Sequence, residues 1–365
     1  MPRRMLLILF LVTFCSHVTA ATPPNLPGGP PWPHGAGQIE ISGGYDDWKQ
    51  WMQHDADIVT VWSAKASTWA DFETGKGDVG YYFTQALKYL PKTTQIVHSY
   101  PMLPEAVSNR NCQNPGVWDQ FARGDFDKYY QTMAQNMKAL IVNSGRDPST
   151  VILRLGWEMN GDWYPWSVCN KVSQFKQSWE RAIVIVRSVM PGMLVDFSVS
   201  RPYLGYTAGR NYNGTAGVSL EGFLPSDSTY SVISRSHHDG NAYTTSDSSW
   251  QQTHISPDPS KKVIGLQELV DVAKAHGKKF ALSEWGTQMA DCDATWKTAP
   301  SPELFIRKTY EFLYANQANL AWDTHFAVSC TALHSRQSSS AAQTYKALWG
   351  SDETQPKPPS GLSID

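Results

Sequence analysis

Two glutamates in this chain stand where chemistry can be placed, each at the end of a short apolar run. Glu158 comes soon after Val151–Leu155 and directly before a turn signal, and Glu284 follows Lys279–Ser283. If both runs are buried strands, the two carboxylates lie at strand ends. Strand ends of one sheet can bring such side chains together over a bound molecule.

Two facing carboxylates are what glycosidic bond cleavage needs, because one must protonate the leaving oxygen while the other attacks the anomeric carbon or activates water. The two groups must differ in pKa. Trp157 and Trp163 are expected to raise the pKa of Glu158 by desolvation, and Arg154 is expected to keep Glu284 ionised. Arg154 lies inside an apolar run, where a guanidinium demands a carboxylate partner. That partner could also be a structural acid alone.

Aromatic residues favour a carbohydrate ligand as well. The chain holds 15 tryptophans, and the apolar faces of sugar rings lie well on flat aromatic rings, while their hydroxyls need polar side chains. For each tryptophan taken alone, core packing is the competing interpretation. The expected substrate-binding residues are Arg154, Trp157, Trp163, Trp166, Trp285, Trp322, Asn160 and His98.

Short apolar runs alternate with longer amphipathic ones, which predicts parallel strands joined by helices. The eight candidate strands are 38–42, 57–62, 94–100, 151–155, 193–199, 230–236, 279–283 and 319–326. Eight such units close a (β/α)₈ TIM barrel, so a single α/β domain is predicted, with an open doubly wound sheet as the alternative. Two long polar segments, 201–228 and 237–262, follow the fifth and sixth strands and are expected at the carboxyl-terminal face.

Helix ends are also marked in the sequence. Asp125 is a candidate cap for a helix stopped by Gly145, Ser173 precedes a second amphipathic run, and Ser301-Pro302 predicts a helix that starts at Pro302.

The two ends of the chain have sequence patterns that differ from that of the barrel. Residues 1–20 have the basic start, short apolar run and small residues of a signal peptide, which predicts a secreted, extracellular protein. Residues 21–37 form a Pro/Gly-rich leader, 38–350 the catalytic domain and 351–365 a C-terminal tail. No later stretch is apolar enough for a transmembrane helix.

Charge excludes some partners. Once Arg3 and Arg4 are removed with the signal peptide, 29 basic residues stand against 33 acidic ones, a formal charge of −4. No basic run favours nucleic acid or an anionic membrane, so a neutral polysaccharide is the expected partner of a monomer. No cofactor is expected.

Four cysteines remain after that cleavage, an even number that predicts two disulfides in an oxidising compartment. Three pairings are possible. The favoured one joins Cys112 to Cys169 and Cys292 to Cys330, since each pair would link loops after neighbouring strands. Zinc is the weaker alternative, because no close Cys-x-x-Cys pair is present.

The segment R-L-G-W-E-M-N-G-D-W-Y-P-W, residues 154–166, resembles the acid/base motif of clan A retaining glycoside hydrolases. It is most similar to family 26, which is known for β-mannanases and also holds β-1,3-xylanases and mixed-linkage glucanases. Ser283, Glu284 and Gly286 match the setting of that family's nucleophile. The resemblance implies Glu158 as acid/base and Glu284 as nucleophile. The matching residues of the first motif are Arg154, Glu158, Met159, Asn160, Gly161, Trp163 and Trp166.

Two positions depart from the family pattern. The residue before the acid/base is usually His in its mannanases and is Trp157 here, which affects the subsite at the cleavage point. The family's tyrosine after the sixth strand, which hydrogen-bonds the nucleophile, has no match. His238 falls at that place and Tyr243 lies just beyond, so both are candidate site residues, with His238 preferred.

The sequence thus predicts a secreted retaining endo-β-glycosidase that hydrolyses a neutral polysaccharide, β-mannan-like or another β-glycan. Two other classes remain open. One is a non-catalytic carbohydrate-binding barrel protein, and the other is a metal-dependent hydrolase that uses His237, His238 and Asp239.

Overall fold

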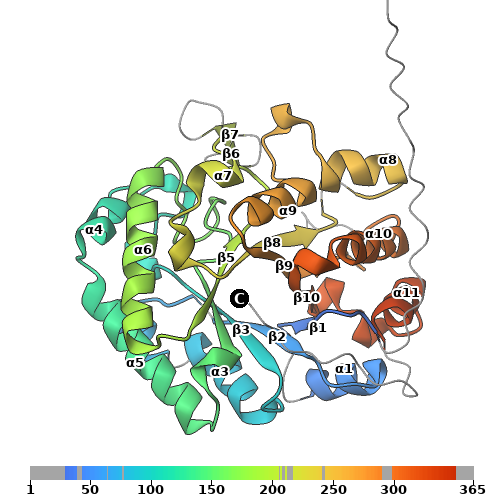
Figure 1. The fold of residues 1–365 in the computed structure, drawn as a ribbon, viewed down its shortest axis with the longest axis horizontal. Coiled ribbons are helices and arrows are strands. Elements are labelled where there is room, and N and C mark those ends of the chain that lie inside the picture. The colour runs from blue at the N-terminus through green and yellow to red at the C-terminus, as the bar shows by residue number, and fades with distance from the viewer. Residues whose placement is uncertain are drawn as a thin grey trace, which may run out of the picture.

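The protein is described here from a computed structural model, which covers residues 29–38, 43–63, 65–75, 78–204, 206–207, 210–211, 217–240, 243–289 and 298–350. Eight parallel strands close into a barrel in the order β1-β10-β9-β8-β5-β4-β3-β2 (Figure 1). The predicted (β/α)₈ barrel is therefore confirmed. The strands are β1 (His34–Gly37), β2 (Ile58–Trp62), β3 (Gln95–Tyr100), β4 (Val151–Leu155), β5 (Leu194–Val199), β8 (Val232–His238), β9 (Lys279–Gly286) and β10 (Leu320–Phe326).

Helices surround this barrel on its outside (Figure 1). Their buried faces pack on the strands, as amphipathic connections between parallel strands must. A separate two-stranded antiparallel sheet, β6 (Tyr206–Thr207) with β7 (Arg210–Asn211), lies in the loop after β5. The helices are α1 (Gly44–Met52), α2 (Trp69–Thr74), α3 (Asp78–Tyr89), α4 (Val117–Arg123), α5 (Asp127–Asn143), α6 (Val172–Val189), α7 (Leu220–Phe223), α8 (Asp247–Trp250), α9 (Leu266–Ala275), α10 (Pro302–Ala315) and α11 (Ser340–Trp349).

The first strand differs from the prediction. It is His34–Gly37, inside the segment expected to be a leader, and 39–42 of the expected strand lie outside the described residues. Close packing explains its composition, because a Cβ on Gly35 would stand 1.9 Å from the carbonyl oxygen of Ile58 and one on Gly37 2.8 Å from the Trp62 ring. Only glycine fits there, so this strand lacks the apolar pattern by which strands are recognised.

The other predicted strands are confirmed within two residues at their starts, but β8 and β9 run further than expected, to His238 and Gly286. Glu284 therefore belongs to β9 itself. The helix predicted from Ser301-Pro302 begins at Pro302. The helices expected after Asp125 and Ser173 begin at Asp127 and Val172, so neither expected cap occupies the N-cap position.

The barrel interior has an apolar floor and a polar upper layer. The floor is a cluster of buried side chains that includes Ile152 and Trp322. Above it, toward the carboxyl ends of the strands, Thr60 and Thr324 share a hydrogen bond of 2.8 Å, and Arg154 lies fully buried. A much larger apolar cluster fills the space between strands and helices.

The two long loops after β5 and β8 are joined to each other. Tyr203 N donates to Lys262 O over 2.9 Å, and Pro202 bridges to Val263. Their place after the carboxyl ends of β5 and β8 is as predicted. Within the described ranges, no helix is long and apolar enough to cross a membrane.

Candidate active site

One cleft opens at the carboxyl-terminal ends of the strands, and it contains both predicted carboxylates. Its volume is about 560 Å³, which lies in the range of ligand-binding clefts. Glu158 follows β4 and Glu284 belongs to β9, so the fold brings together two residues that are far apart in the sequence. The lining residues are Glu158, Trp163, Tyr164, Ser200, Arg201, Arg235, Ser236, His238, Gly240, Glu284 and Phe326.

The backbone at Glu158 is held in an unusual conformation. Its φ of +56° lies in the left-handed region, where a residue other than glycine costs about 1 kcal/mol or more. Two hydrogen bonds hold it there: Glu158 N donates to Ser198 O over 3.0 Å, and Gly161 N donates to Glu158 O over 2.9 Å. Strain of this kind is typical of residues whose position is set by function.

The side chain of Glu158 is fixed by Trp163, whose Nε1 donates to Oε2 over 2.9 Å. Gly161 permits this contact, because a Cβ there would stand 2.5 Å from the Trp163 ring. Burial raises the pKa of Glu158, and the negative charge of Glu284 raises it further, against the smaller opposing effects of Ser236 and Arg154. The predicted desolvation is thus present, and it acts in the direction that a general acid needs.

Glu284 is held from below by Arg154, which is fully buried in β4. The Nη1 and Nη2 atoms of Arg154 lie 3.2 and 3.3 Å from Glu284 Oε2. The guanidinium also donates to three serine hydroxyls, those of Ser99, Ser198 and Ser236, at 2.8–3.1 Å. Arg154 therefore does not reach the cleft, and its predicted substrate contact is replaced by a contact with Glu284.

His238 approaches Glu284 from the side. Its Nε2 lies 3.1 Å from Oε1, and because an ionised carboxylate can only accept, Nε2 carries the hydrogen. Burial alone would raise the pKa of Glu284, but the His238 hydrogen bond and the Arg154 charge outweigh it, so this pKa is lowered. The preference for His238 over Tyr243 agrees with this contact, since Tyr243 is not among the residues that line the cleft.

The two carboxyl groups thus have their pKa values moved in opposite directions. Glu158 favours the protonated form and Glu284 the ionised form, which is how pairs of acids divide the roles of proton donor and anion. The arrangement can protonate a leaving oxygen at one side of the cleft and present a nucleophilic carboxylate at the other.

Several predicted substrate contacts are wrong, because the structure buries those tryptophans in the core. Trp166 is fully buried and donates to Trp157 O, while Trp157 itself is 3% exposed. Trp285 donates to Asp323 Oδ2 over 2.7 Å, and Trp322 fills the barrel floor. The sequence could not separate these rings from Trp163, because position near a strand end does not tell which face a side chain takes.

Asn160 is a loop clamp and not a sugar ligand. It is 1% exposed, its Oδ1 accepts from Ser200 N over 2.8 Å, and its Nδ2 donates to Ser200 O and Pro202 O. This side chain joins the turn that carries Glu158 to the loop after β5.

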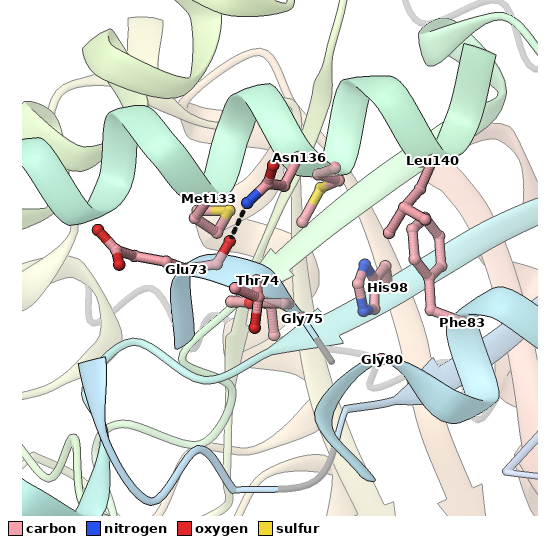
Figure 2. A pocket seen from close by; sticks show the side chains of 11 residues that line it. Glu73, Thr74, Gly75, Gly80, Phe83, His98, Met133, Asn136 and Leu140 are labelled. Carbon is pink, nitrogen blue, oxygen red and sulfur yellow. Dashed lines mark hydrogen bonds between the residues drawn. The ribbon is translucent and has the colours of Figure 1, made fainter. Parts of the chain in front are cut away.

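His98 lies elsewhere. It is buried, its ring stacks on Phe83 with centroids 3.8 Å apart, and Nε2 pairs with Ser63 Oγ over 2.7 Å. Figure 2 shows it beside Asn136 and Leu140 of α5, at a cavity of about 10 Å³ that is separate from the cleft. The cavity has room for about one water molecule. His98 is therefore not a substrate ligand.

The sequence reading missed several residues that line the cleft. Tyr164 stands in the recognised motif next to Trp163, and Phe326 is the last residue of β10. Arg235 lies in β8, VISRSHH, which is mostly polar in sequence, so it does not stand out as Arg154 does in its apolar strand. Arg201, directly after β5, does not stand out either.

A disulfide joins Cys112 and Cys169, with Cα atoms 5.8 Å apart, and this predicted pairing is confirmed. Cys330 also takes part in a disulfide, while Cys292, its expected partner, lies outside the described residues.

The metal-dependent alternative needs His237, His238 and Asp239 to converge, and they do not. His237 faces outward and stacks on Phe305, whereas His238 faces Glu284. Across the part of the chain that the structure covers, no three His, Cys, Asp or Glu side chains are grouped so as to hold a metal ion.

Comparisons with known proteins give a likeness in structure alone. No protein-family model matches the chain, and no curated protein sequence does. Among solved structures it is similar to GH26C from Muricauda sp., with a TM-score of 0.57, 13% identity, and 89% and 91% of the two chains covered. The chain shares the fold of family 26 structures.

Two further structures support that statement. The endo-β-1,4-mannanase of Cellulomonas fimi matches with a TM-score of 0.57 and 14% identity, over 87% of this chain and 72% of that one. The mannanase man26 of Bacillus subtilis matches with a TM-score of 0.55 and 12% identity, over 92% and 91%. At these identities the likeness shows the (β/α)₈ fold, and the site must carry the argument about function.

Proposed function

We propose that this protein is a retaining β-glycosidase that hydrolyses a β-linked polysaccharide. The observation that carries the proposal is the cleft in which Glu284, held by Arg154 and His238, faces the same space as Glu158, with the two pKa values moved apart. A β-mannan-like glycan is the first candidate substrate, since several structures of similar fold are mannanases.

The reaction proceeds in two displacements. In the first, Glu284 attacks the anomeric carbon and forms a glycosyl-enzyme ester, while Glu158 gives its proton to the departing glycosidic oxygen. In the second, Glu158, now ionised, takes a proton from water, whose oxygen attacks the same carbon and releases Glu284. Two inversions at one carbon give net retention.

Residues around the pair support each step. The Trp163 N–H orients the carboxyl group of Glu158 by donating to its Oε2. Arg154 and His238 keep Glu284 ionised before attack. Trp163, Tyr164 and Phe326 give the cleft aromatic walls on which sugar rings can stack.

The expected route to its substrate is secretion. Residues 1–20, outside the described part, carry the signal-peptide pattern. Edman sequencing of the protein exported by an expression host tests this, with a mature start near Ala21 or Thr22 as the expected result. We also propose that the protein acts as a monomer, which light scattering of the purified protein tests.

The decisive experiment follows the anomeric form of the first products. Mannans, β-glucans and xylans are screened, and proton NMR is recorded early in the digestion, before mutarotation. The β-anomer is expected first, and an initial α-anomer excludes the double displacement. Glu284→Gln is expected to abolish hydrolysis, while the exposed Glu221→Gln is the matched control that leaves it unchanged.

A second experiment separates the two roles. On aryl glycosides with good leaving groups, Glu158→Ala with azide is expected to yield the β-glycosyl azide, and Glu284→Ala with azide the α-glycosyl azide. If the wild-type protein hydrolyses none of the glycans but binds one, it is a carbohydrate-binding protein on a barrel scaffold.

A further inference from the structure

Two arginines line the cleft beside the carboxylate pair. Arg201 follows β5 and Arg235 belongs to β8, so both stand on the wall formed by these neighbouring strands. Arg201 is partly exposed, and Arg235 is fully buried from solvent. Neither residue has a role in the double displacement, because Arg154 already supplies the positive charge that Glu284 needs.

Neither arginine is neutralised within the described part of the chain. Arg201 Nη2 donates to Thr253 O over 3.1 Å, and Arg235 Nη1 donates to Ile264 O over 2.7 Å, so both contact backbone carbonyls where a carboxylate would be expected. The buried atoms Arg201 Nε and Arg235 Nη2 have no hydrogen-bond partner. Burying a guanidinium with an unpaired N–H donor costs free energy unless another group accepts that hydrogen bond and balances the charge.

Glu268 does not supply the missing hydrogen-bond acceptor. Glu268 acts on Arg235 only through its charge, since its two oxygens accept from Tyr203 Oη over 3.1 Å and from Leu220 N over 3.3 Å. Burial and, to a smaller extent, the positive charge of Arg201 lower the pKa of Arg235 to about 9, as expected for two cations with too little negative charge beside them. Both remain protonated near neutral pH.

A purely structural role explains only part of this arrangement. Both side chains tether the long loop between β8 and α9, through Thr253 and Ile264. An uncharged donor would tether a carbonyl equally well and would avoid placing two positive charges side by side at a cleft wall. The positive charge itself therefore calls for a further partner, and such a partner can reach the pair from the cleft at Arg201, the partly exposed member.

We propose that Arg201, backed by the charge of the buried Arg235, forms an anion subsite, so that the substrate is a β-glycan with an acidic substituent, either a uronate carboxylate or a sulfate ester. Planar guanidinium groups bind both anions through paired N–H donors. The formal charge of −4 predicted a neutral partner, but that number averages over the chain, whereas these two residues act within the cleft. This inference rests on the proposed glycosidase function and names its substrate class.

The test compares the hydrolysis of each acidic polymer with that of a neutral polymer of the same backbone, which is called its neutral twin. Glucuronomannan and glucuronoxylan are compared with their carboxyl-reduced forms, and sulfated mannan and sulfated β-glucan with their desulfated forms. The wild-type protein is expected to cleave one acidic member with kcat/KM at least about tenfold above its twin. Which pair shows the preference distinguishes carboxylate from sulfate. Added salt is expected to reduce the preference, since the cleft is open to solvent.

Variants tie that preference to the subsite. Arg201→Met removes the more accessible charge, and its kcat/KM values on the acidic polymer and on the neutral twin are expected to differ by no more than about threefold. Arg201→Lys is expected to retain part of the preference for the acidic polymer. Arg307→Met, which removes an exposed arginine from α10, is the control of equal charge change and should keep the full preference. The substrate preference of Arg235→Met is interpreted only if the unfolding midpoint of this variant equals that of the wild type, because the Arg235 side chain is fully buried.

The possible results separate this inference from the proposed function. If retaining hydrolysis occurs but every neutral twin is cleaved as well as its acidic partner, the anion subsite is refuted and the glycosidase proposal stands. The same holds if Arg201→Met leaves an acidic preference intact. If no polymer in any pair is hydrolysed, both proposals fail together.

Discussion

Arg154 and Glu284 are 130 residues apart in the sequence, and their side chains are joined by two hydrogen bonds, of 3.2 and 3.3 Å, to a single carboxylate oxygen. The other oxygen of Glu284 is held by His238. A carboxylate bound in this way is ordered and ionised before any substrate arrives, and it stands at the wall of the cleft that Glu158 shares. The predictions about activity below depend on this relationship.

Replacing Arg154 should affect both activity and stability. Arg154→Met leaves Glu284 without its buried counter-charge, so the pKa of Glu284 rises and the acid limb of the kcat/KM profile moves to higher pH. We expect kcat/KM at neutral pH to fall roughly 10²-fold or more, and the free energy of unfolding to fall by about 3–5 kcal/mol. Activity profiles and urea denaturation measure the two effects.

Arg154→Lys distinguishes charge from geometry. Lysine keeps the positive charge but not the paired donors, so an intermediate loss is expected. A wild-type pH profile in Arg154→Met would show that the arginine serves only the barrel interior, which was the structural alternative raised by the sequence.

Glu158 should set the alkaline limit of activity. Its raised pKa keeps the acid protonated to higher pH than an ordinary glutamate, and kcat/KM falls once this proton is lost. Trp163→Phe removes an N–H that stabilises the ionised form, so the pKa of Glu158 rises further and the alkaline limb moves to higher pH. The acid limb, set by Glu284, is the internal control and should stay in place. An alkaline limb that moves to lower pH contradicts this assignment.

Asp323 predicts a pH dependence of stability that is separate from catalysis. Three indole N–H groups donate to this buried carboxylate: those of Trp32 at 2.6 Å, Trp285 at 2.7 Å and Trp349 at 3.3 Å. Burial raises its pKa to about 6 against these opposing hydrogen bonds. The native protein therefore binds this proton more tightly than the unfolded chain does. The contribution of Asp323 to the free energy of unfolding is full below about pH 4 and is lost as the pH rises through 6.

The corresponding variant is Asp323→Asn. We expect the wild type to lose up to about 3 kcal/mol of unfolding free energy from this group between pH 4 and pH 7, a loss that is absent in the variant. The amide also places an NH₂ group against an indole donor, which costs about 1–3 kcal/mol. Urea denaturation of both proteins at several pH values measures the difference, and parallel curves would contradict the prediction.

The alternation of strands and helices predicted the barrel. The charged residues at its centre could be predicted because each of them breaks the pattern of its neighbours in the sequence. An arginine inside an apolar strand and a glutamate at a strand end are rare enough to be informative. Arg154 does contact Glu284, which lines the same cleft as Glu158. The first strand was missed for the opposite reason, since Gly35 and Gly37 are required by close contact with β2 and leave no apolar pattern.

The tryptophans were the least predictable residues. Trp163 lines the cleft, whereas Trp285 is a core residue whose indole N–H donates a hydrogen bond to Asp323. Both roles need a large ring with one donor, and only the spatial position of the partner separates them. Arg201 was missed because its meaning depends on Arg235, a neighbour supplied by strand pairing between β5 and β8.

The disulfide between Cys112 and Cys169 should support the active-site turn as well as the fold. It closes a loop across 57 positions of sequence separation, for which chain entropy gives about 4 kcal/mol of stabilisation. Nearby, Asn111 N donates to Asp162 O over 2.7 Å, so the same two loops also meet beside Trp163.

In the double variant Cys112→Ser with Cys169→Ser, we expect the free energy of unfolding to be lower by up to about 4 kcal/mol. Because the turn that positions Trp163 and Glu158 is freer, kcat/KM should also fall, by up to about tenfold. Thermal denaturation and steady-state kinetics at one temperature well below the midpoint separate these effects. A lowered midpoint with unchanged kcat/KM would mean that the backbone hydrogen bonds hold the turn without the disulfide.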